Sequence, residues 1–281
     1  EAYYDKYLRG VDGAILTPSD LVGKELEGES AYYTPPVSGL NVVTTIDFRI
    51  QRVVENVLDL VMQGHSPKGA RCIVVNPQTG EVLAMSSKPS VDLNNLPRDN
   101  IGELMASTKN MLITDVYEPG STFKVLTAAA MLEEYARGNP KAHSASYVFP
   151  NNANFRIVDG SRVKCWTTHT SSKHCNQNLG DALNNSCNPI FTDIGLSLGK
   201  ETMYKYLSAF GYGAVSGIDF AGEQAGLLVA ESAVTNGDLA RISFGQTIAV
   251  TPLQLAMATS AAVNGGLLMQ PYLVKEIRTQ E

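Results

Sequence analysis

The sequence predicts an α+β domain, and three features of the 281-residue chain carry this prediction. Strand-like apolar segments lie near both ends, at 40–46 and 271–277. A hairpin pattern of two apolar runs occupies 69–87, and helical periodicity fills most of the region that follows. Strands that bracket a helical region in this way are typical of α+β domains.

Size and composition limit the class of protein. The chain has a mass of 30.2 kDa, with 44% hydrophobic and 18% charged residues, which is typical of a globular protein. Its net charge of −6 argues against nucleic acid as a partner, because proteins that bind nucleic acids usually present a basic face. No apolar run approaches the roughly 20 residues that a membrane span needs.

The chain divides into an arm and a main domain. Residues 1–40 are rich in Tyr, Gly and Pro and begin without Met, so we expect a linker from an N-terminal domain outside this chain. Residues 41–281 are expected to form the main domain. Within it, 41–88 and about 214–281 would form the sheet part, and 89–213 the mainly helical part.

The first elements of the main domain follow from periodicity. Asp47 is expected to cap a helix that continues to about Gly64, because apolar residues recur at helical spacing. These residues are Ile50, Val53, Val54, Val57, Leu58 and Val61. The hairpin that follows should turn around Asn76–Gly80, and the polar stretch 89–108 is expected to be a loop.

Helices are predicted in three later regions. The first runs from Ser121 to about Arg137, and the second covers about 178–210 with an interruption before Pro189. The third opens at Thr251-Pro252, a typical N-cap and first-turn pair. Residues 139–176 are expected to be irregular, and 218–229 to form a strand.

Ser121 and Lys124 are the first candidates for chemistry. They lie three residues apart at a predicted helix start, in EPGSTFK, so both side chains project from one face. An apolar run follows Lys124, and desolvation can lower the pKa of an amine enough for it to remove a serine proton. The alternative is a plain N-cap serine beside a surface lysine.

Ser186 and Asn188 form a second candidate pair, in NNSCNPIF. With one residue between them, both side chains can face a cleft while Cys187 points to the other side. A hydroxyl can relay a proton, and an amide can both donate and accept hydrogen bonds. The alternative is a capping sequence for the helix at Pro189.

The motifs S-x-x-K and S-x-N together resemble those of class B penicillin-binding proteins, the peptidoglycan transpeptidases of cell division and sporulation. Further blocks resemble that family: VVTTIDFRIQRVVE, VVNPQTGEVLAMSSKPS, YEPGSTFK, NNSCNP and ISFGQTIAVTPLQLAMATSAAVNGG. The resemblance implies the transpeptidase fold that serine β-lactamases share. In this fold a central antiparallel sheet is flanked by helices and carries an inserted all-helical subdomain.

The resemblance also implies roles. Ser121 would attack the penultimate D-alanine carbonyl of a peptidoglycan stem peptide to form an acyl-enzyme, and β-lactams would acylate the same serine. Lys124 would be the base, Ser186 would relay a proton to the leaving amine, and Asn188 would hold the substrate amide. The implied partners are stem peptides, β-lactams and a membrane-embedded glycan polymerase. The implied location is the extracytoplasmic face of the bacterial membrane, reached through an N-terminal anchor.

One family feature does not occur in the printed sequence. The family's third motif, K-T-G, lies downstream of the other two and supplies an oxyanion donor, yet neither K-T-G nor K-S-G stands in these 281 residues. Without this donor we expect a rate lower by roughly 10²–10³. Two other readings therefore stay open, a non-catalytic sensor of β-lactams or wall peptides and a β-lactamase. A β-lactamase would need a deacylating carboxylate, for which Glu223 and Glu231 stand in the right range.

A cluster of cysteines and histidines precedes the second motif. Thiolates and imidazoles at this density are typical of a tetrahedral zinc site. The expected ligands are Cys165, His174, Cys175 and Cys187, with His169 as the first substitute. A disulfide or ordinary buried thiols are the alternatives.

Two further residues are weaker candidates. Trp166, beside the first cysteine of the cluster, is expected in the core. Gln246 would line the cleft by the family resemblance, or would be a buried structural amide.

Overall fold

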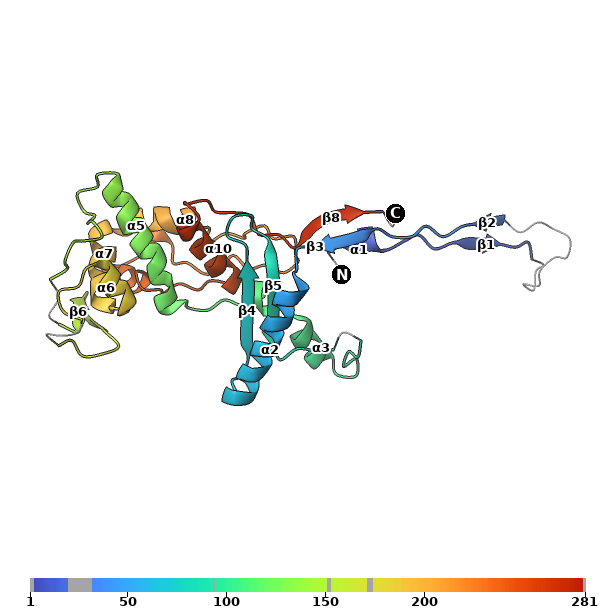
Figure 1. The fold of residues 1–281 in the computed structure, drawn as a ribbon, viewed down its shortest axis with the longest axis horizontal. Coiled ribbons are helices and arrows are strands. Elements are labelled where there is room, and N and C mark those ends of the chain that lie inside the picture. Colours follow the sequence, from blue (N-terminus) through green and yellow to red (C-terminus); the bar gives the residue numbers. More distant parts are fainter. Residues whose placement is uncertain (1–2, 20–31, 93, 151–152, 171–173, 280–281) are drawn as a thin grey trace. The chain divides into compact units, whose positions relative to one another are not determined.

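The computed structural model describes residues 3–19, 32–92, 94–150, 153–170 and 174–279, which form two compact units (Figure 1). The first unit comprises Glu1–Thr45, Asp219–Ala221 and Tyr272–Glu281. The second comprises Ile46–Ile218 and Gly222–Pro271. Helices and strands both contribute to the chain, and the strands of the described residues pair two by two, always antiparallel.

The first unit contains a short helix and two strand pairs. Its elements are α1 (Asp5–Leu8), β1 (Ala14–Leu16) paired with β2 (Tyr32–Thr34), and β3 (Asn41–Thr44) paired with β8 (Val274–Arg278). The predicted terminal strands are therefore present, and they pair with each other. Asp219 fastens this unit, because its carboxylate accepts hydrogen bonds from the hydroxyl of Tyr4 at 2.5 Å and from the amide of Leu273 at 2.6 Å.

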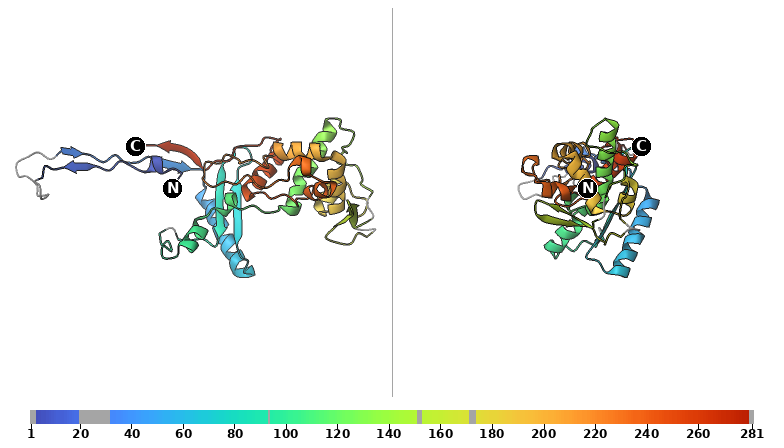
Figure 2. Two further views of the ribbon diagram at one scale, coloured as in Figure 1. Left: turned by 180° about the vertical axis from the view of Figure 1, so that it is seen from behind. Right: turned by 90° about the vertical axis from the view of Figure 1, so that its left-hand side faces the viewer.

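The second unit opens with the predicted helix and hairpin. These are α2 (Phe48–His65), β4 (Ala70–Val75) and β5 (Val82–Lys88). Asp47 caps α2 as expected, since its carboxylate accepts the amide of Arg49 at 2.8 Å. The helix lies along the hairpin (Figure 2) and buries Val54 and Leu58 beside Ala84.

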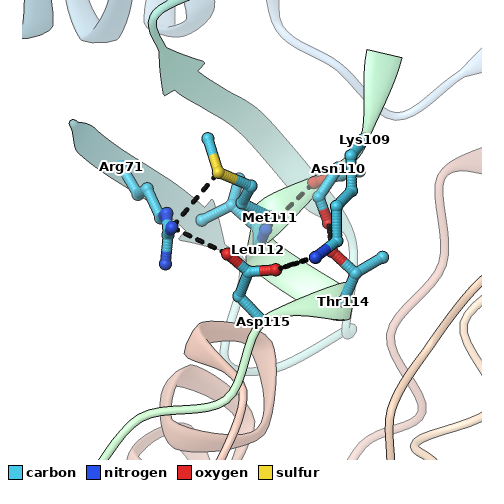
Figure 3. Close-up of polar contacts among 7 residues, drawn as sticks. All are labelled: Arg71, Lys109, Asn110, Met111, Leu112, Thr114 and Asp115. Carbon is cyan, nitrogen blue, oxygen red and sulfur yellow. Dashed lines mark hydrogen bonds and ion pairs between the residues drawn. The ribbon is translucent and has the colours of Figure 1, made fainter. Parts of the chain in front are cut away.

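The loop prediction for 89–108 is wrong in its last two fifths, because α3 (Ile101–Thr108) forms there and α4 (Met111–Thr114) follows. Apolar residues at helical spacing in IGELMAST were the overlooked signal. The segment after these helices is fastened to β4 by Asp115, whose carboxylate pairs with Arg71 at 2.8 Å and with Lys109 (Figure 3). Partial burial opposes the charge of Asp115, but the ion pairs with Lys109 and Arg71 hold its pKa below the ordinary value.

The remaining helices of the second unit build its main core. They are the 3₁₀ turn η1 (Gly120–Phe123), α5 (Lys124–Ala136), α6 (Leu179–Asn184), α7 (Asn188–Leu198), α8 (Lys200–Ala209), η2 (Glu231–Ala233), α9 (Asn236–Ile242) and α10 (Pro252–Val263). Buried side chains from several of them form one cluster around Phe123, Ile190, Phe191, Ile194 and Ile242. Thr251 caps α10 as predicted and forms a capping box with Gln254.

Two further predictions of secondary structure are wrong, one of an irregular region and one of a strand. Residues 139–176 contain a hairpin of β6 (Phe155–Val158) and β7 (Ser161–Lys164), which turns at Asp159-Gly160 with both φ angles positive. Asp-Gly favours this type of two-residue turn. Residues 218–229 do not form a strand; Leu227 makes only an isolated bridge to Ala249, because Gly222 and Gly226 adopt positive φ and interrupt the extended run. Within the described residues, every helix is too short or too polar to cross a membrane.

Candidate active site

A sharp turn presents Ser121 to solvent at the start of the η1–α5 helix. Gly120 has a positive φ of 57°, and its amide donates to the carbonyl of Gly245 at 2.9 Å. The hydroxyl of Ser121 makes no capping bond; its contacts are with Lys124 and Ser186. The plain N-cap interpretation of this serine therefore does not describe the turn.

Lys124 is completely buried, with a relative exposure of 0%. Its Nζ lies 3.2 Å from the Oγ of Ser121, 2.9 Å from the Oγ of Ser186 and 2.7 Å from the Oδ1 of Asn188. The backbone carbonyl of Ser186 is a fourth acceptor, at 2.9 Å. Burial lowers the pKa of Lys124 to about 8, although the nearby thiols of Cys165 and Cys187 act in the opposite direction.

The second pair of candidate residues closes this group. Ser186 adopts a positive φ of 52°, and its Oγ donates to the Oγ of Ser121 at 2.8 Å. Asn188 is the first residue of α7, and its Nδ2 donates to the carbonyl of Lys164 at 3.0 Å. The amide is thereby oriented with its oxygen toward Lys124. All four candidate residues lie in the second unit, in one hydrogen-bonded group.

A lysine amine has only three protons when it is charged, so four oxygen acceptors cannot all be satisfied at once. With a pKa near 8, a substantial fraction of Lys124 is neutral close to physiological pH. The arrangement can therefore take a proton from Ser121 and pass it on through Ser186.

Four possible metal ligands lie close to this group, since one of them, Cys187, stands between Ser186 and Asn188. The side-chain ligand atoms of Cys165, His169, His174 and Cys187 all lie within 4.8 Å of one another. The Sγ of Cys165 is 3.8 Å from Nδ1 of His174, and the Sγ of Cys187 is 3.8 Å from Nε2 of His169. Hydrogen bonds from Cys187, from His169 and from backbone amides lower the pKa of Cys165, which favours its thiolate. All four cysteines of the chain lie in described residues, and none forms a disulfide.

Comparison with known proteins assigns the family. The family model described as the penicillin binding protein transpeptidase domain matches residues 70–281. This chain belongs to that family.

The relatives agree with this assignment. The chain is 39% identical over 277 residues to stage V sporulation protein D of Bacillus subtilis (strain 168), which covers 98% of this chain and 41% of that protein. It is 30% identical over 256 residues to peptidoglycan D,D-transpeptidase FtsI of Escherichia coli (strain K12), and this alignment covers 91% of this chain and 40% of that protein. The chain thus spans about two fifths of the length of these curated relatives.

The solved structures confirm the fold. Penicillin binding protein 2X from Streptococcus thermophilus aligns with a TM-score of 0.79 at 26% identity, over 98% of this chain and 39% of that chain. The α+β class and the penicillin-binding-protein transpeptidase fold expected from the sequence are therefore confirmed.

In this penicillin-binding protein domain the Cys/His cluster differs from the predicted ligand set. Cys175 is outside the cluster, and His169 takes its place. His174 adopts a left-handed conformation, with φ of 63°, and its side chain turns into the cluster. The side chain of the next residue in the chain, Cys175, does not join it there.

The structure also corrects the core placement of Trp166 and one of the two interpretations of Gln246. Trp166 is 69% exposed and so is not a core residue; its Nε1 donates to the carbonyl of Asn185 at 3.0 Å, which leaves much of the ring in solvent. The side chain of Gln246 is exposed, so it is not a buried structural amide.

The sequence interpretation missed two kinds of contact at the site. The carbonyl of Lys164 orients Asn188, but a backbone acceptor leaves no mark in the sequence. The carboxylate of Glu118 accepts the amide of Thr247 at 2.9 Å. The available signal for this contact was the position of Glu118 inside YEPGSTFK, the block that carries Ser121.

Proposed function

We propose that this chain carries the acylation site of a serine peptidoglycan D,D-transpeptidase, which forms an acyl-enzyme on Ser121 and is acylated there by β-lactams. The observation that carries the proposal is the buried Lys124 amine, which lies within hydrogen-bond distance of the hydroxyls of Ser121 and Ser186. Family membership and relatives named as D,D-transpeptidases support it.

The first half of the reaction uses three side chains. Neutral Lys124 takes the proton of the Ser121 hydroxyl as Oγ bonds to the penultimate D-alanine carbonyl carbon. Negative charge develops on the carbonyl oxygen, next to the backbone amide of Ser121 at the start of the helix. The C–N bond then breaks, and Ser186 relays the proton from Lys124 to the leaving D-alanine amine.

The second half transfers the acyl group. The amine of a neighbouring stem peptide attacks the ester carbonyl and loses a proton to the same lysine through Ser186. The ester C–O bond then breaks, and Lys124 returns this proton to Oγ, so that Ser121 leaves as the free hydroxyl. Asn188 donates from Nδ2 to the carbonyl of Lys164 and accepts at Oδ1 from Lys124, so it orients the base. The family resemblance assigns it a contact with the substrate amide as well. No step of this scheme consumes a cofactor.

The experiment uses the protein at its natural length and a fluorescent penicillin. We expect covalent labelling that approaches one equivalent and decays slowly, and no labelling of Ser121→Ala. Rapid turnover of a chromogenic cephalosporin would instead indicate a β-lactamase. Reversible penicillin binding, equally tight in Ser121→Ala and with no adduct in either protein, would indicate a non-catalytic sensor and would end the proposal.

Present contacts argue against the β-lactamase alternative. The carboxylate of Glu223 accepts the amides of Ser216 at 2.7 Å and Gly217 at 3.1 Å, so it fastens its own loop. Glu231 begins the short η2 turn and is exposed. Neither glutamate makes a described hydrogen bond to Ser121, Lys124 or Ser186.

We further propose the cellular setting that the resemblance implies. The domain would act on the extracytoplasmic face of the bacterial membrane, held by an N-terminal anchor and working beside a membrane-embedded glycan polymerase. The higher identity to stage V sporulation protein D than to FtsI, 39% against 30%, favours a role in sporulation over one in division.

We also propose that the Cys/His cluster binds a structural zinc ion. Two thiolates and two imidazoles are a common zinc ligand set, and tetrahedral bond lengths place such ligand atoms about 3.3–3.8 Å apart. The two sulfur–nitrogen distances of 3.8 Å fit this requirement after a small contraction. The metal would stiffen the segment that joins Ser186 to Asn188, because Cys187 lies between them.

Metal analysis tests the ligand set as well as the metal. Protein purified without added zinc is expected to contain close to one equivalent, and His169→Ala is expected to lose most of it. Cys175→Ser is the matched control and is expected to keep its zinc, because Cys175 lies outside the cluster. Less than about 0.2 equivalents in the parent protein, together with loss of free thiols, would favour a disulfide instead.

A further inference from the structure

The turn that carries Ser121 is held against the segment 243–250 by several backbone contacts. On one side of the turn, Tyr117 and Val250 exchange two hydrogen bonds, at 3.0 and 2.9 Å. At its apex the amide of Gly120 donates to the carbonyl of Gly245 at 2.9 Å. The position of Ser121 therefore depends on the conformation of a segment more than 120 residues later in the chain.

The two backbones touch so closely at Gly245 that no side chain fits. A Cβ at this position would lie 2.2 Å from the carbonyl oxygen of Gly120 and 2.7 Å from the Cβ of Phe123. Gly245 also has a positive φ of 81°, which glycine adopts readily. A displacement of the 245–247 backbone would therefore be transmitted directly to the residue that precedes Ser121.

Thr247, two residues later, has a conformation that its own side chain disfavours. Its φ is 64°, in the left-handed region, where β-branched residues are rare because the branched Cβ crowds the backbone. Such a conformation persists only when surrounding contacts enforce it. The contact that can enforce it is the charge-assisted hydrogen bond from the amide of Thr247 to Oε1 of Glu118, at 2.9 Å.

We propose that Glu118 is a positioning residue for the nucleophile: its carboxylate holds Thr247 in the left-handed conformation, and this keeps segment 245–247 seated on the Ser121 turn. The inference rests on the proposed function for its kinetic readout. It assigns Glu118 no contact with substrate and no proton transfer. Its effect passes through the backbone, from Thr247 to Gly245 and from there to Gly120 and Ser121.

A double-mutant cycle tests this route, with the rate constant for acylation by benzylpenicillin as readout. Glu118→Ala is expected to lower the rate about tenfold, and Glu118→Gln, which keeps a carbonyl acceptor, by less than about threefold. Thr247→Gly removes the cost of the left-handed conformation and should change the rate by less than about twofold. In the Thr247→Gly background, Glu118→Ala should lower the acylation rate by less than about threefold. Glycine adopts the left-handed conformation readily, so the carboxylate is no longer needed to enforce it.

Asp115→Asn is the matched control. Asp115 is a second carboxylate of the same segment, but it pairs with Arg71 and Lys109 rather than with Thr247 (Figure 3). Any loss of rate in Asp115→Asn should be the same with Thr or Gly at position 247. An equal loss for Glu118→Ala in both backgrounds would overturn the proposal, since the carboxylate would then act on substrate or on general stability.

Amide hydrogen exchange gives a second readout that does not depend on activity. The peptide around Thr247 should be protected in the parent and in Glu118→Gln, and should exchange faster in Glu118→Ala. If Ser121 of the parent is never acylated, the proposed function fails. Hydrogen exchange then tests the contact between Glu118 and Thr247 without any kinetic measurement. Equal exchange in the parent and in Glu118→Ala would then overturn the inference.

Discussion

At the scale of single residues, the central feature is a buried lysine that has no carboxylate partner among the described residues. In the part of the chain that the structure describes, the hydrogen-bond partners of Lys124 are hydroxyl, amide and carbonyl oxygens, and the rings of Phe191 and Phe244 lie 5.4 and 5.9 Å away. Burial of a cation without a countercharge costs free energy, and the cost is smaller when the amine is neutral. The same environment that destabilises the charged form therefore favours the neutral amine, which is the form that the proposed base requires.

The pH dependence of acylation follows from this shift. Only neutral Lys124 can accept the serine proton, and burial lowers its pKa to about 8, so the acylation rate should rise with pH through about 8 and then level off. The thiols of Cys165 and Cys187 face this amine and raise its pKa in part, so the profile should be recorded on protein of known metal content. Measured rates of penicillin acylation between pH 6 and 9.5 check the prediction.

Lys124→Arg is the companion variant. Arginine keeps the positive charge and stays protonated over the whole pH range, so it cannot accept the serine proton. The acylation rate should therefore fall by about 10²–10⁴ and should no longer rise near pH 8. A flat profile in the parent, or an arginine variant with the parent's profile, would show that Lys124 is not the base.

The residue scale also shows which parts of the site can be read from the sequence. The convergence of Ser121, Lys124, Ser186 and Asn188 could be expected through the resemblance to penicillin-binding proteins, because neither motif alone indicates that the two pairs meet in space. His169 is a candidate ligand from its place in the sequence, but its preference over Cys175 could not be read there. In the structure His174 has a left-handed backbone and joins the cluster with His169, whereas the adjacent Cys175 does not.

At the scale of elements, the β6–β7 hairpin carries two groups that the site needs. The carbonyl of Lys164, at the end of β7, orients Asn188, and Cys165 follows immediately. The hairpin is fastened to α7 by Arg156, whose Nε and Nη2 bind the two carboxylate oxygens of Asp193 at 2.8 and 2.7 Å. This bidentate pair is partly buried, unlike most surface ion pairs.

Asp193→Asn should therefore lower the free energy of unfolding by about 1–2 kcal/mol, because it removes the charge and one of the two matched acceptors. Glu133→Gln breaks the exposed pair of Glu133 with Arg137 on α5 and should change stability by less than about 0.5 kcal/mol. Thermal or denaturant unfolding of both variants checks the difference. Equal effects would show that the Arg156–Asp193 pair does not fasten the hairpin.

Elements with a strong period were predictable and those set by turns were not. Helix α2 and the β4–β5 hairpin could be predicted from their regular apolar spacing, and the start of α2 from the cap at Asp47. The β6–β7 hairpin lies in a polar region, and its Asp159-Gly160 turn was the only strong local cue. Residues 218–229 are apolar enough for a strand, but their glycines at positive φ prevent it.

At the scale of the whole molecule, the candidate site belongs entirely to the second unit. The hydrogen bonds described for its four residues join residues of the second unit. The family match covers residues 70–281, and the chain spans about two fifths of its curated relatives. Kinetic measurements therefore belong on the protein at its natural length, where the K-T-G motif expected by resemblance can be looked for directly.

The most direct test of the central claim is the position of the covalent adduct. After brief exposure to benzylpenicillin and proteolysis, mass spectrometry should find the added mass of one opened β-lactam on the peptide that contains Ser121, and fragmentation should place it on that serine. The same treatment of Ser121→Ala should yield no adduct. Modification at Ser186, at a cysteine or at no residue in correctly folded protein would contradict the account.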